Sequence, residues 1–267
     1  MNRLRSGLGT LMLSVGLAEV AAEFGLRRLR LSGADALSAR GRANWLQDAA
    51  ATVLKRIGVE VEAEGDPPLD GLVVSNHLSY LDVLAYASLM PCAFVAKQEV
   101  RGWPVFGRFA TMGGTIYVNR QRHGANAGPT QRMEEALEAS VPVALFPEGT
   151  SSDGQSVLRF RSGFFEPAVR TKALVTAAAI GYASSTAEEA ALAYYGKDVF
   201  GPHLVRTLGQ RKVEARVIFA ARGRRYADRK EAARVTQTEV EQLRSAIAGH
   251  RPATQNPSGF YRLTRAG

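Results

Sequence analysis

From Gly58 onward, short apolar runs alternate with longer segments of helical periodicity, a pattern typical of a parallel sheet covered by helices. Glu214 and Arg216 alternate with apolar residues in the last of these runs, so we place that strand near an edge of the sheet. The expected fold class is α/β, with a largely parallel central sheet flanked by helices. We predict strands over residues 58–64, 72–75, 93–97, 115–118, 141–146, 174–180 and 213–219, and helices over 81–90, 127–140, 163–171 and 228–248.

Polar side chains follow several of these strands at the point where each strand ends. Asn76 and His77 follow one strand, Asn119 and Arg120 follow another, and residues 147–154 follow a third. Ligands of open α/β sheets bind beyond the carboxyl ends of the strands, so these residues are candidates for one site. Each also has a structural alternative: His77 as a hydrogen-bonded residue, Arg120 as a solvated charge, and residues 147–154 as a polar turn.

His77 and Asp82 are the strongest candidates for a catalytic pair. Histidine titrates near neutral pH, so it can take a proton from an alcohol and pass it on. Asp82 stands at the start of the next predicted helix, where it can accept from the second ring nitrogen and fix the tautomer. Backbone amides near His77 or at the start of that helix are expected to stabilise an oxyanion.

The charge of the chain favours an anionic partner. Its 267 residues carry Lys+Arg 34 against Asp+Glu 25, a formal net charge of +9, which suits nucleic acid, lipid head groups or phosphorylated substrates. A basic proteome would give the same excess. The single cysteine, Cys92, excludes an internal disulfide, and the 4 histidines lack metal-ligand spacing, so we expect no metal.

Residues 1–57 are predicted to form two helices ahead of the catalytic domain. The first, up to Arg30, is interrupted by Glu19 and Glu23, which argues against a membrane-spanning helix and a signal peptide. Its apolar residues and flanking arginines suit an amphipathic helix in a membrane interface, with an ordinary surface helix as the alternative. The second covers residues 35–57, where Trp45 is either an interfacial anchor or a core residue.

Three short motifs stand in order along the chain. They are Asn76-His77 with Asp82; Gly114 and Ile116 with Arg120; and Phe146 to Thr150. Each is weak alone, but the ordered set resembles the glycerolipid acyltransferase superfamily, the 1-acylglycerol-3-phosphate and glycerol-3-phosphate acyltransferases. The resemblance covers residues 58–220 and includes Lys97 with Glu99.

The resemblance implies transfer of a fatty acyl group to the hydroxyl of a lysolipid, with 1-acylglycerol-3-phosphate as the first acceptor to consider. The donor would be an acyl-coenzyme A or acyl-carrier-protein thioester, with no other cofactor. His77 and Asp82 would be catalytic. The implied substrate-binding residues are Asn76, Lys97, Gly114, Arg120, Glu148, Gly149, Thr150 and Ser151.

Two departures from the family pattern bear on the acceptor. The third motif usually continues with arginine where this chain has Ser151, so Arg120, Arg159 or Arg161 would have to hold a phosphate. The fourth motif normally contains a proline, which is absent from residues 175–179. Ser151 with the nearby Asp and Gly also resembles a bacterial subgroup that includes lyso-ornithine lipid acyltransferases, so O-acylation of a lyso-ornithine lipid or another lysolipid is the alternative.

The predicted organisation is amino-terminal helices over residues 1–57, an acyltransferase domain over 58–248 and a loose tail over 249–267. The charge and the helices fit a peripheral or shallowly embedded enzyme on the cytoplasmic face of the inner membrane, with an anionic membrane surface as partner. A hydrolase is the rival enzyme class, but the chain has no Gly-x-Ser-x-Gly elbow. A basic nucleic-acid- or lipid-binding protein is the non-enzyme alternative; the basic residues are dispersed, which disfavours nucleic acid.

Overall fold

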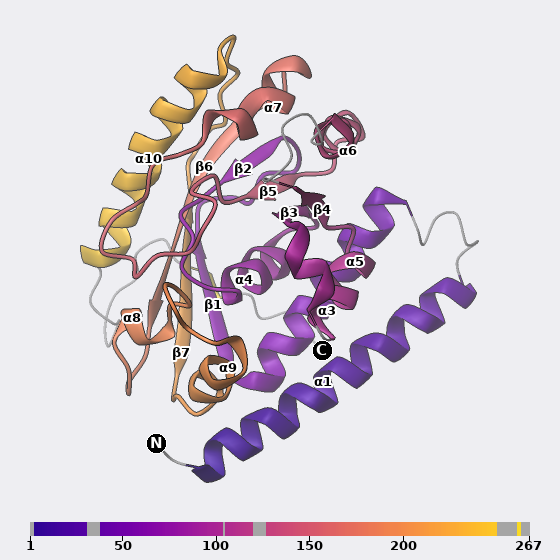
Figure 1. The fold of residues 1–267 in the computed structure, drawn as a ribbon, viewed down its shortest axis with the longest axis vertical. Coiled ribbons are helices and arrows are strands. Elements are labelled where there is room, and N and C mark those ends of the chain that lie inside the picture. The colour runs from indigo at the N-terminus through magenta and orange to yellow at the C-terminus, as the bar shows by residue number, and fades with distance from the viewer. Residues whose placement is uncertain (1–2, 31–37, 104, 120–126, 250–260, 263–267) are drawn as a thin grey trace.

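An eight-stranded sheet is the centre of the computed structural model, which describes residues 3–30, 38–103, 105–119, 127–249 and 261–262 (Figure 1). The strands lie in the order β4-β3-β5-β2-β6-β7-β1-β8. Their bounds are β1 (Val59–Glu64), β2 (Leu72–Val74), β3 (Ala93–Lys97), β4 (Ile116–Val118), β5 (Val143–Leu145), β6 (Val175–Ala183), β7 (Val213–Phe219) and β8 (Tyr261–Arg262).

Most of the strand pairs are parallel, as predicted. β4, β3, β5, β2 and β6 form one parallel group, while β7 and β1 pair in parallel with each other. The two groups meet at the antiparallel β6–β7 pair, and β8 runs antiparallel to β1. The carboxyl ends of β2, β3 and β5 therefore lie on the same side of the sheet, and the candidate residues follow these strand ends.

As predicted, β7 lies near an edge of the sheet, with β1 and the two-residue strand β8 beyond it, but it is an interior strand between β6 and β1. Arg216, whose charge suggested an exposed strand, is buried and forms ion pairs with Glu214 at 2.9 Å and with Glu62 of β1 at 3.7 Å. A charged residue can stand in an interior strand when neighbouring carboxylates compensate it. The charged residues that alternate with apolar ones in this strand therefore mark ion pairs between a buried arginine and two partly exposed carboxylates.

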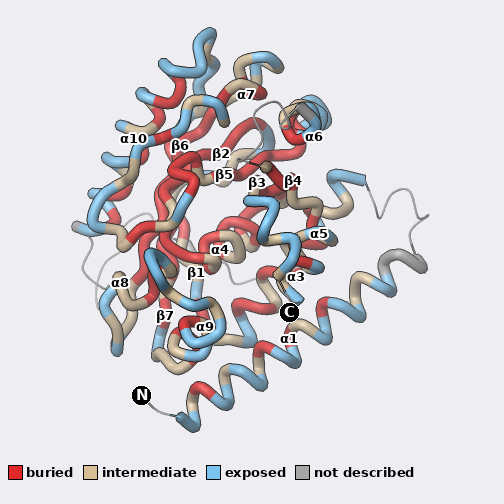
Figure 2. Tube along the Cα trace, viewed as in Figure 1, coloured by how far each residue is buried: buried red, intermediate tan, exposed pale blue. Residues whose placement is uncertain are grey.

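Helices cover both faces of the sheet, and the central strands β2, β5 and β6 are buried on both sides (Figures 1 and 2). Val73 of β2 packs with α3 and α4 on one face, whereas Leu72 and Val74 pack with α6 and α10 on the other. The helices are α1 (Arg3–Arg30), α3 (Ala39–Ile57), α4 (Leu81–Leu89), α5 (Phe106–Met112), α6 (Ala127–Glu138), α7 (Glu166–Arg170), α8 (Glu189–Leu192), α9 (Phe200–Leu208) and α10 (Arg229–Gly249). Two short 3-10 helices, η1 (Gln98–Gly102) and η2 (Ser162–Phe165), complete the described elements.

Helix α3 is anchored in the core and leads directly into β1. Ser38 caps its first turn by accepting from the Gly41 N–H at 3.0 Å, and Gly58 ends it in a left-handed conformation. Trp45 is buried, with its ring centroid 4.9 Å from that of Phe24 in α1. Of the two alternatives for Trp45, the core position is therefore correct.

Helix α1 packs along α3 and α9 with one face and presents apolar side chains on the other. Gly9 and Gly16 lie against Leu208 and Arg56, and a Cβ atom on Gly9 would meet the Leu208 carbonyl oxygen at 2.8 Å. The exposed large apolar residues of α1 are Leu4, Leu8, Leu11, Val15 and Leu26. Contrary to expectation, the segment Arg3–Leu26 is long and apolar enough, by length and composition, to cross a membrane.

Three further elements were not anticipated from the sequence. Helices α8 and α9 lie in the connection between β6 and β7, for which no helix was predicted. In the segment expected to be a loose tail, Tyr261–Arg262 forms the two-residue strand β8 and pairs with Glu62 and Ala63. The rest of that tail lies outside the described residues.

Candidate active site

His77 and Asp82 meet just beyond the carboxyl end of β2. The strand ends at Val74, and the chain turns into α4, whose first turn carries Asp82. The imidazole Nδ1 lies 2.7 Å from Asp82 Oδ2. When Nδ1–H donates to the carboxylate, Nε2 carries the lone pair, which is the tautomer that a general base requires.

The Asp82 carboxylate is fully buried and heavily hydrogen-bonded. Besides His77, Oδ2 accepts the backbone N–H groups of Leu78 at 2.7 Å and Ser79 at 3.0 Å. Oδ1 accepts the Tyr182 hydroxyl of β6 at 2.5 Å. These donors stabilise a negative charge that burial alone would disfavour, so Asp82 can face His77 as a carboxylate.

The loop after β5 holds His77 from the other side. The Phe146 ring stacks on the imidazole, with centroids 4.2 Å apart and an interplanar angle of 8°. Glu148 Oε1 accepts the His77 backbone N–H at 3.0 Å, and the Ser152 N–H donates to the His77 carbonyl at 2.9 Å. The third sequence motif therefore fixes both the ring and the backbone of the histidine.

Glu148 is buried, and only one of its two carboxyl oxygens has a hydrogen-bond partner. Burial raises its pKa to about 8, against the opposing effect of hydrogen bonds from the backbone of His77 and Leu158. Its Oε2 atom is buried without a hydrogen-bond partner. The neutral form of Glu148 is therefore favoured near neutral pH.

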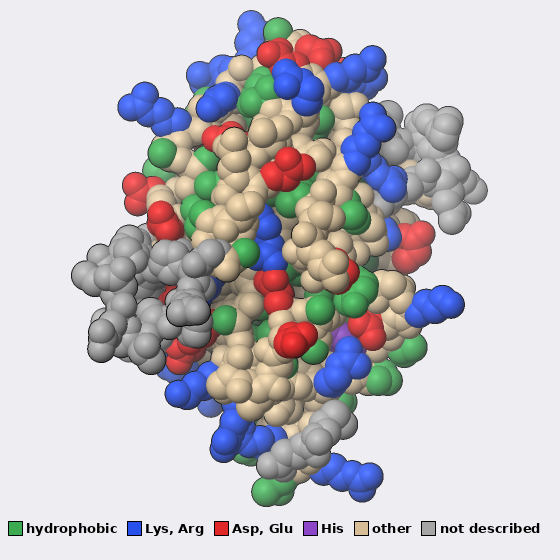
Figure 3. Space-filling model, turned by 90° about the vertical axis from the view of Figure 1, so that its left-hand side faces the viewer, with side chains coloured by type: hydrophobic (Ala, Val, Ile, Leu, Met, Phe, Trp, Pro, Cys, Tyr) green, Lys and Arg blue, Asp and Glu red, His purple; other side chains and the backbone are tan. Residues whose placement is uncertain are grey.

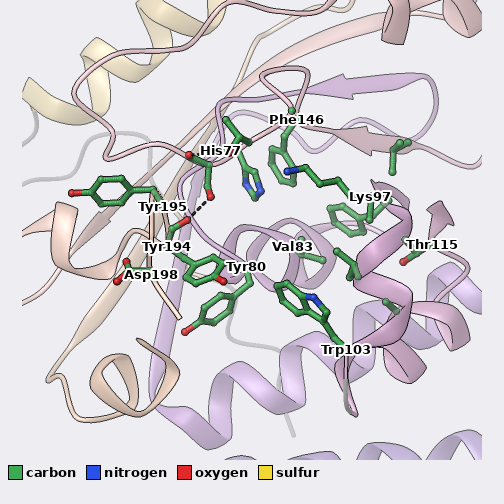
Figure 4. Close-up of a pocket in the computed structure, with 18 of the residues that line it drawn as sticks. His77, Tyr80, Val83, Lys97, Trp103, Thr115, Phe146, Tyr194, Tyr195 and Asp198 are labelled. Atoms are coloured by element: carbon green, nitrogen blue, oxygen red, sulfur yellow. Dashed lines mark hydrogen bonds between the residues drawn. The ribbon is translucent and has the colours of Figure 1, made fainter. Parts of the chain in front are cut away.

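A cavity of about 380 Å³ opens beside His77 (Figure 4). Its walls are mostly apolar and aromatic, and the side chain of Lys97, from the end of β3, extends toward His77 and Phe146. Besides these three residues, the lining includes Tyr80, Val83, Phe94, Trp103, Thr115, Tyr194, Tyr195 and Asp198. An apolar cavity with one base at its wall suits a substrate that joins a hydrocarbon chain to a reactive polar group.

Comparisons with known proteins agree with this geometry. A family model described as Acyltransferase matches residues 59–181. A lyso-ornithine lipid O-acyltransferase from Pseudomonas aeruginosa is 32% identical over 252 residues, which cover 93% of each chain. The chain belongs to the acyltransferase family.

Two other relatives of this acyltransferase are informative. A 1-acyl-sn-glycerol-3-phosphate acyltransferase from Neisseria meningitidis is 32% identical over 164 residues, which cover 61% of this chain and 64% of that protein, less than two thirds of its length. The crystal structure of the 1-acyl-sn-glycerophosphate acyltransferase PlsC from Thermotoga maritima matches with a TM-score of 0.70 and 17% identity, over 95% of this chain and 100% of that one. The latter confirms the expected α/β fold with an amino-terminal helix.

The structure describes seven of the eight expected substrate-binding residues, and four of them line the cavity. Lys97, Gly149, Thr150 and Ser151 line the cavity. Gly114, Glu148 and Asn76 do not, although Thr115 beside Gly114 does. Arg120 lies outside the described residues, and the side chains of Arg159 and Arg161 are exposed and do not line the cavity.

Asn76 pins the sheet and does not face the cavity. Its side-chain amide donates to the Ile180 carbonyl at 2.9 Å and accepts the Ile180 N–H at 2.9 Å. The β2–β6 ladder ends at Val74, and the Asn76 side chain takes the place of the next backbone pair. The Asn76 side chain therefore connects β2 to β6 and does not line the cavity, where we expected it to contact substrate.

The amides near His77 are also used differently from the expectation. The N–H of His77 donates to Glu148, and those of Leu78 and Ser79 donate to Asp82. These three groups hold the His77–Asp82 pair in place and are not free to bind an oxyanion.

Sequence reasoning missed the residues that reach the site from β6 and from the segment before α9. Tyr182 binds Asp82, and Tyr194 and Tyr195 line the cavity next to Tyr80. The Ser151 hydroxyl donates to the Tyr194 carbonyl, so the segment before α9 is bonded to the residue that follows the third motif (Figure 4). The only signal in the sequence was the Tyr194-Tyr195 pair itself, since alternate strand residues such as Tyr182 look like ordinary core.

Proposed function

We propose that this protein transfers a fatty acyl group from an acyl thioester to the hydroxyl of a lysolipid. The observation that carries the proposal is the His77–Asp82 pair, joined at 2.7 Å at the wall of an apolar cavity. A hydrocarbon-lined site with a tautomer-fixed base matches the chemistry of esterifying a lipid alcohol. Family membership supports the same reaction.

The reaction needs no covalent enzyme intermediate. His77 Nε2 takes the proton of the lysolipid hydroxyl while its oxygen attacks the thioester carbonyl carbon, and Asp82 stabilises the imidazolium that forms. As the tetrahedral intermediate collapses, the carbon–sulfur bond breaks and the imidazolium returns the proton to the leaving thiolate. A positioned base is worth about 10²- to 10⁴-fold, so holding both substrates together must supply much of the remaining acceleration.

The donor in this proposal is an acyl-coenzyme A or an acyl-carrier-protein thioester. Lys97 and the loop of Gly149, Thr150 and Ser151 line the cavity next to His77, where they can contact the polar parts of either substrate. The acyl chain would lie along the apolar wall. The reaction requires no metal and no cofactor beyond the thioester.

For the acceptor we propose a lyso-ornithine lipid first and 1-acylglycerol-3-phosphate second. Relatives named lyso-ornithine lipid O-acyltransferase include one that aligns over 93% of both chains, whereas the Neisseria 1-acyl-sn-glycerol-3-phosphate acyltransferase aligns over 61% of this chain. Ser151 replaces an arginine expected for a phosphate acceptor, and its hydroxyl is already bonded to the Tyr194 carbonyl. The 1-acylglycerol-3-phosphate alternative is supported by Lys97 at the cavity wall, which offers a positive charge to a phosphate.

We place the enzyme on the cytoplasmic leaflet of the inner membrane, where lipid acceptors and thioester donors meet. The outer face of α1 exposes Leu4, Leu8, Leu11 and Val15 at helical spacing, while its inner face packs on the domain. Exposed apolar side chains in a row are costly in water and favourable in a lipid interface. The net charge of +9 adds attraction to anionic head groups.

Two rival functions are less well supported. A hydrolase would require a nucleophile, and Cys92 is buried, with burial raising the pKa of its thiol. A nucleic-acid-binding protein would require clustered positive charge, but on the face in Figure 3 the basic side chains are spread out, with acidic ones among them.

The test is an acylation assay with the purified full-length protein. Labelled acyl-coenzyme A, and in a second set acyl-carrier-protein thioester, is offered with lyso-ornithine lipid and 1-acylglycerol-3-phosphate in parallel. We expect acylated lyso-ornithine lipid from the wild type and none from a folded His77→Ala variant. If only 1-acylglycerol-3-phosphate is acylated, that lipid and not lyso-ornithine lipid is the acceptor. Free fatty acid without acylated lipid would indicate a hydrolase. Absence of product from every pair would overturn the proposal, and turnover by His77→Ala would remove His77 from the mechanism.

A further inference from the structure

We infer that Tyr182 is a positioning residue of the active site, which fixes the Asp82 carboxylate through its second oxygen. This inference rests on the proposed role of His77 and Asp82. Tyr182 stands in β6, 100 residues from Asp82, and belongs to none of the three sequence motifs. Its hydroxyl donates to Asp82 Oδ1 at 2.5 Å, while His77 uses Oδ2 at 2.7 Å.

The two oxygens of the Asp82 carboxylate have different hydrogen-bond partners. Oδ2 receives His77 and the two backbone amides of Leu78 and Ser79, all from the chain around the motif itself. Oδ1 receives Tyr182 from across the sheet. A carboxylate held at both oxygens cannot rotate about its last torsion, so the plane that faces the imidazole is fixed.

The fold places Tyr182 at this position through β6. Ala178, Ile180 and Tyr182 alternate along one face of the strand and pack in the same core cluster as α4. Asn76 clamps the Ile180 backbone at both its N–H and its carbonyl. The end of β2 and the tyrosine two residues beyond the clamp are therefore held in one register.

A partly buried ion pair holds the backbone of Tyr182 in turn. Glu189 Oε1 accepts the Tyr182 N–H at 2.6 Å, and Glu189 Oε2 is bonded to Arg244 of α10. Arg244 also donates to the Gly154 carbonyl at 3.3 Å, in the loop of the third motif. Gly181 leaves room for this arginine, since a Cβ there would lie 2.8 Å from Arg244 Nη1.

The chemistry of the contact favours a neutral phenol that donates. Burial, together with the nearby Asp82 charge, raises the pKa of Tyr182 well above its usual value, so the hydroxyl keeps its proton. A phenylalanine would leave Asp82 Oδ1 buried without this donor. The carboxylate would then hold the proton of the pair more tightly, and its orientation toward His77 would loosen.

Several ionisable groups surround the carboxylate, and each remains in place in the variant described below. They are His77, Tyr86, Glu148 and Glu189, with Arg244 behind Glu189.

Tyr86 supplies a matched control for the test. It is also a buried tyrosine near Asp82, but its hydroxyl donates to Ser75 Oγ at 2.7 Å. Tyr86→Phe therefore removes a buried phenol and one hydrogen bond without touching the carboxylate. Any effect common to both variants reports packing, and an effect confined to Tyr182→Phe reports positioning.

The experiment compares the wild type, Tyr182→Phe and Tyr86→Phe in steady-state acylation across pH. A hydrogen bond to a charged group contributes about 1.5–3 kcal/mol, so we expect kcat of Tyr182→Phe to fall roughly 10- to 100-fold with KM for both substrates unchanged. The acidic limb of its pH–rate profile should move to higher pH. Tyr86→Phe should keep kcat within about twofold and the limb in place. Equal kinetics in the two variants would overturn the inference.

A readout independent of turnover separates this inference from the proposed function. In ¹⁵N-histidine spectra of the full-length protein, we expect the His77 signal of the wild type to report a proton on Nδ1 at neutral pH. In Tyr182→Phe the chemical shift of the His77 Nδ1–H that donates to Asp82 should change, and in Tyr86→Phe it should not. That result would support the positioning role even for a protein inactive toward every acceptor tested. An unchanged His77 Nδ1–H signal in Tyr182→Phe would refute it.

Discussion

Glu148 accepts a hydrogen bond from the backbone N–H of His77 at 3.0 Å, although the two residues stand 71 positions apart. The motif that contains Glu148 thus acts on the motif that contains the base. The carboxyl group is only 3% exposed, and its Oε2 atom has no partner. A carboxylate in this position would be poorly solvated, which is why burial raises the pKa of Glu148 to about 8.

This raised pKa predicts a pH-dependent stability that Glu148→Gln should remove. A carboxyl group that binds its proton more tightly in the native state than at its ordinary pKa of 4.5 stabilises the fold at low pH. That contribution is lost as pH rises from 4.5 toward about 8. Denaturant unfolding at pH 5.5 and pH 8.5 should show Glu148→Gln gaining on the order of 3 kcal/mol relative to the wild type across this interval. A constant difference would mean that Glu148 titrates normally.

Asn76 should contribute to the stability of the fold. Asn76→Ala leaves the N–H and carbonyl of Ile180 buried without their partners, so we expect a loss of about 2–4 kcal/mol in the free energy of unfolding. Asn76→Asp, which keeps the size but cannot donate to the Ile180 carbonyl and adds a buried charge, should lose at least as much. Urea denaturation measures both. Near-native stability combined with a raised KM for the acceptor would instead indicate that Asn76 binds substrate.

Much of the fold and the centre of the site follow from local sequence patterns. The strand ends at Val74 and Leu145 could be predicted because the buried apolar runs stop at polar motifs. His77 and Asp82 could be paired because His77 follows a strand end closely and Asp82 lies in the first turn of the next helix. The strand ends also predicted that residues 147–154 would share one site with His77, and Gly149, Thr150 and Ser151 line the cavity beside it.

What could not be predicted depends on contacts between distant strands. Asn76 and Glu148 belong to motifs, yet their side chains serve the protein backbone, at Ile180 and at His77. Tyr182 looks like one more apolar position in a buried strand until β6 is placed beside β2. Arg216 suggested an exposed strand because a single sequence does not reveal that Glu62 of another strand compensates it. Polar residues in buried strands need the sheet order before they can be interpreted.

Phe146 should tune the base through its stacked ring. The two rings lie 4.2 Å apart and nearly parallel, so Phe146→Leu removes the flat surface that restricts imidazole rotation while keeping much of the volume. Aromatic pairs contribute about 0.5–1.5 kcal/mol, which corresponds to a fall in kcat of roughly 2- to 12-fold. Single-turnover kinetics on acylation isolates this step. Phe94→Leu, at a ring 6.4 Å from Phe146 and not stacked on His77, is the control for cavity lining. A similar loss in both variants would assign the effect to substrate packing.

The outer face of α1 should determine membrane binding. Leu8 and Leu11 are each 56% exposed on the side of the helix away from the domain, so Leu8→Glu with Leu11→Glu should leave the fold intact. Inserting a leucine side chain into lipid contributes about 1.5–3 kcal/mol, and a carboxylate reverses that gain and repels anionic head groups. We expect co-sedimentation with vesicles containing anionic phospholipid to weaken at least tenfold, because losing even one such insertion amounts to about a factor of ten. Leu69→Glu is the control, since Leu69 is 85% exposed in the connection between β1 and β2. Equal weakening by the control would make net charge, and not the face of α1, the cause of binding.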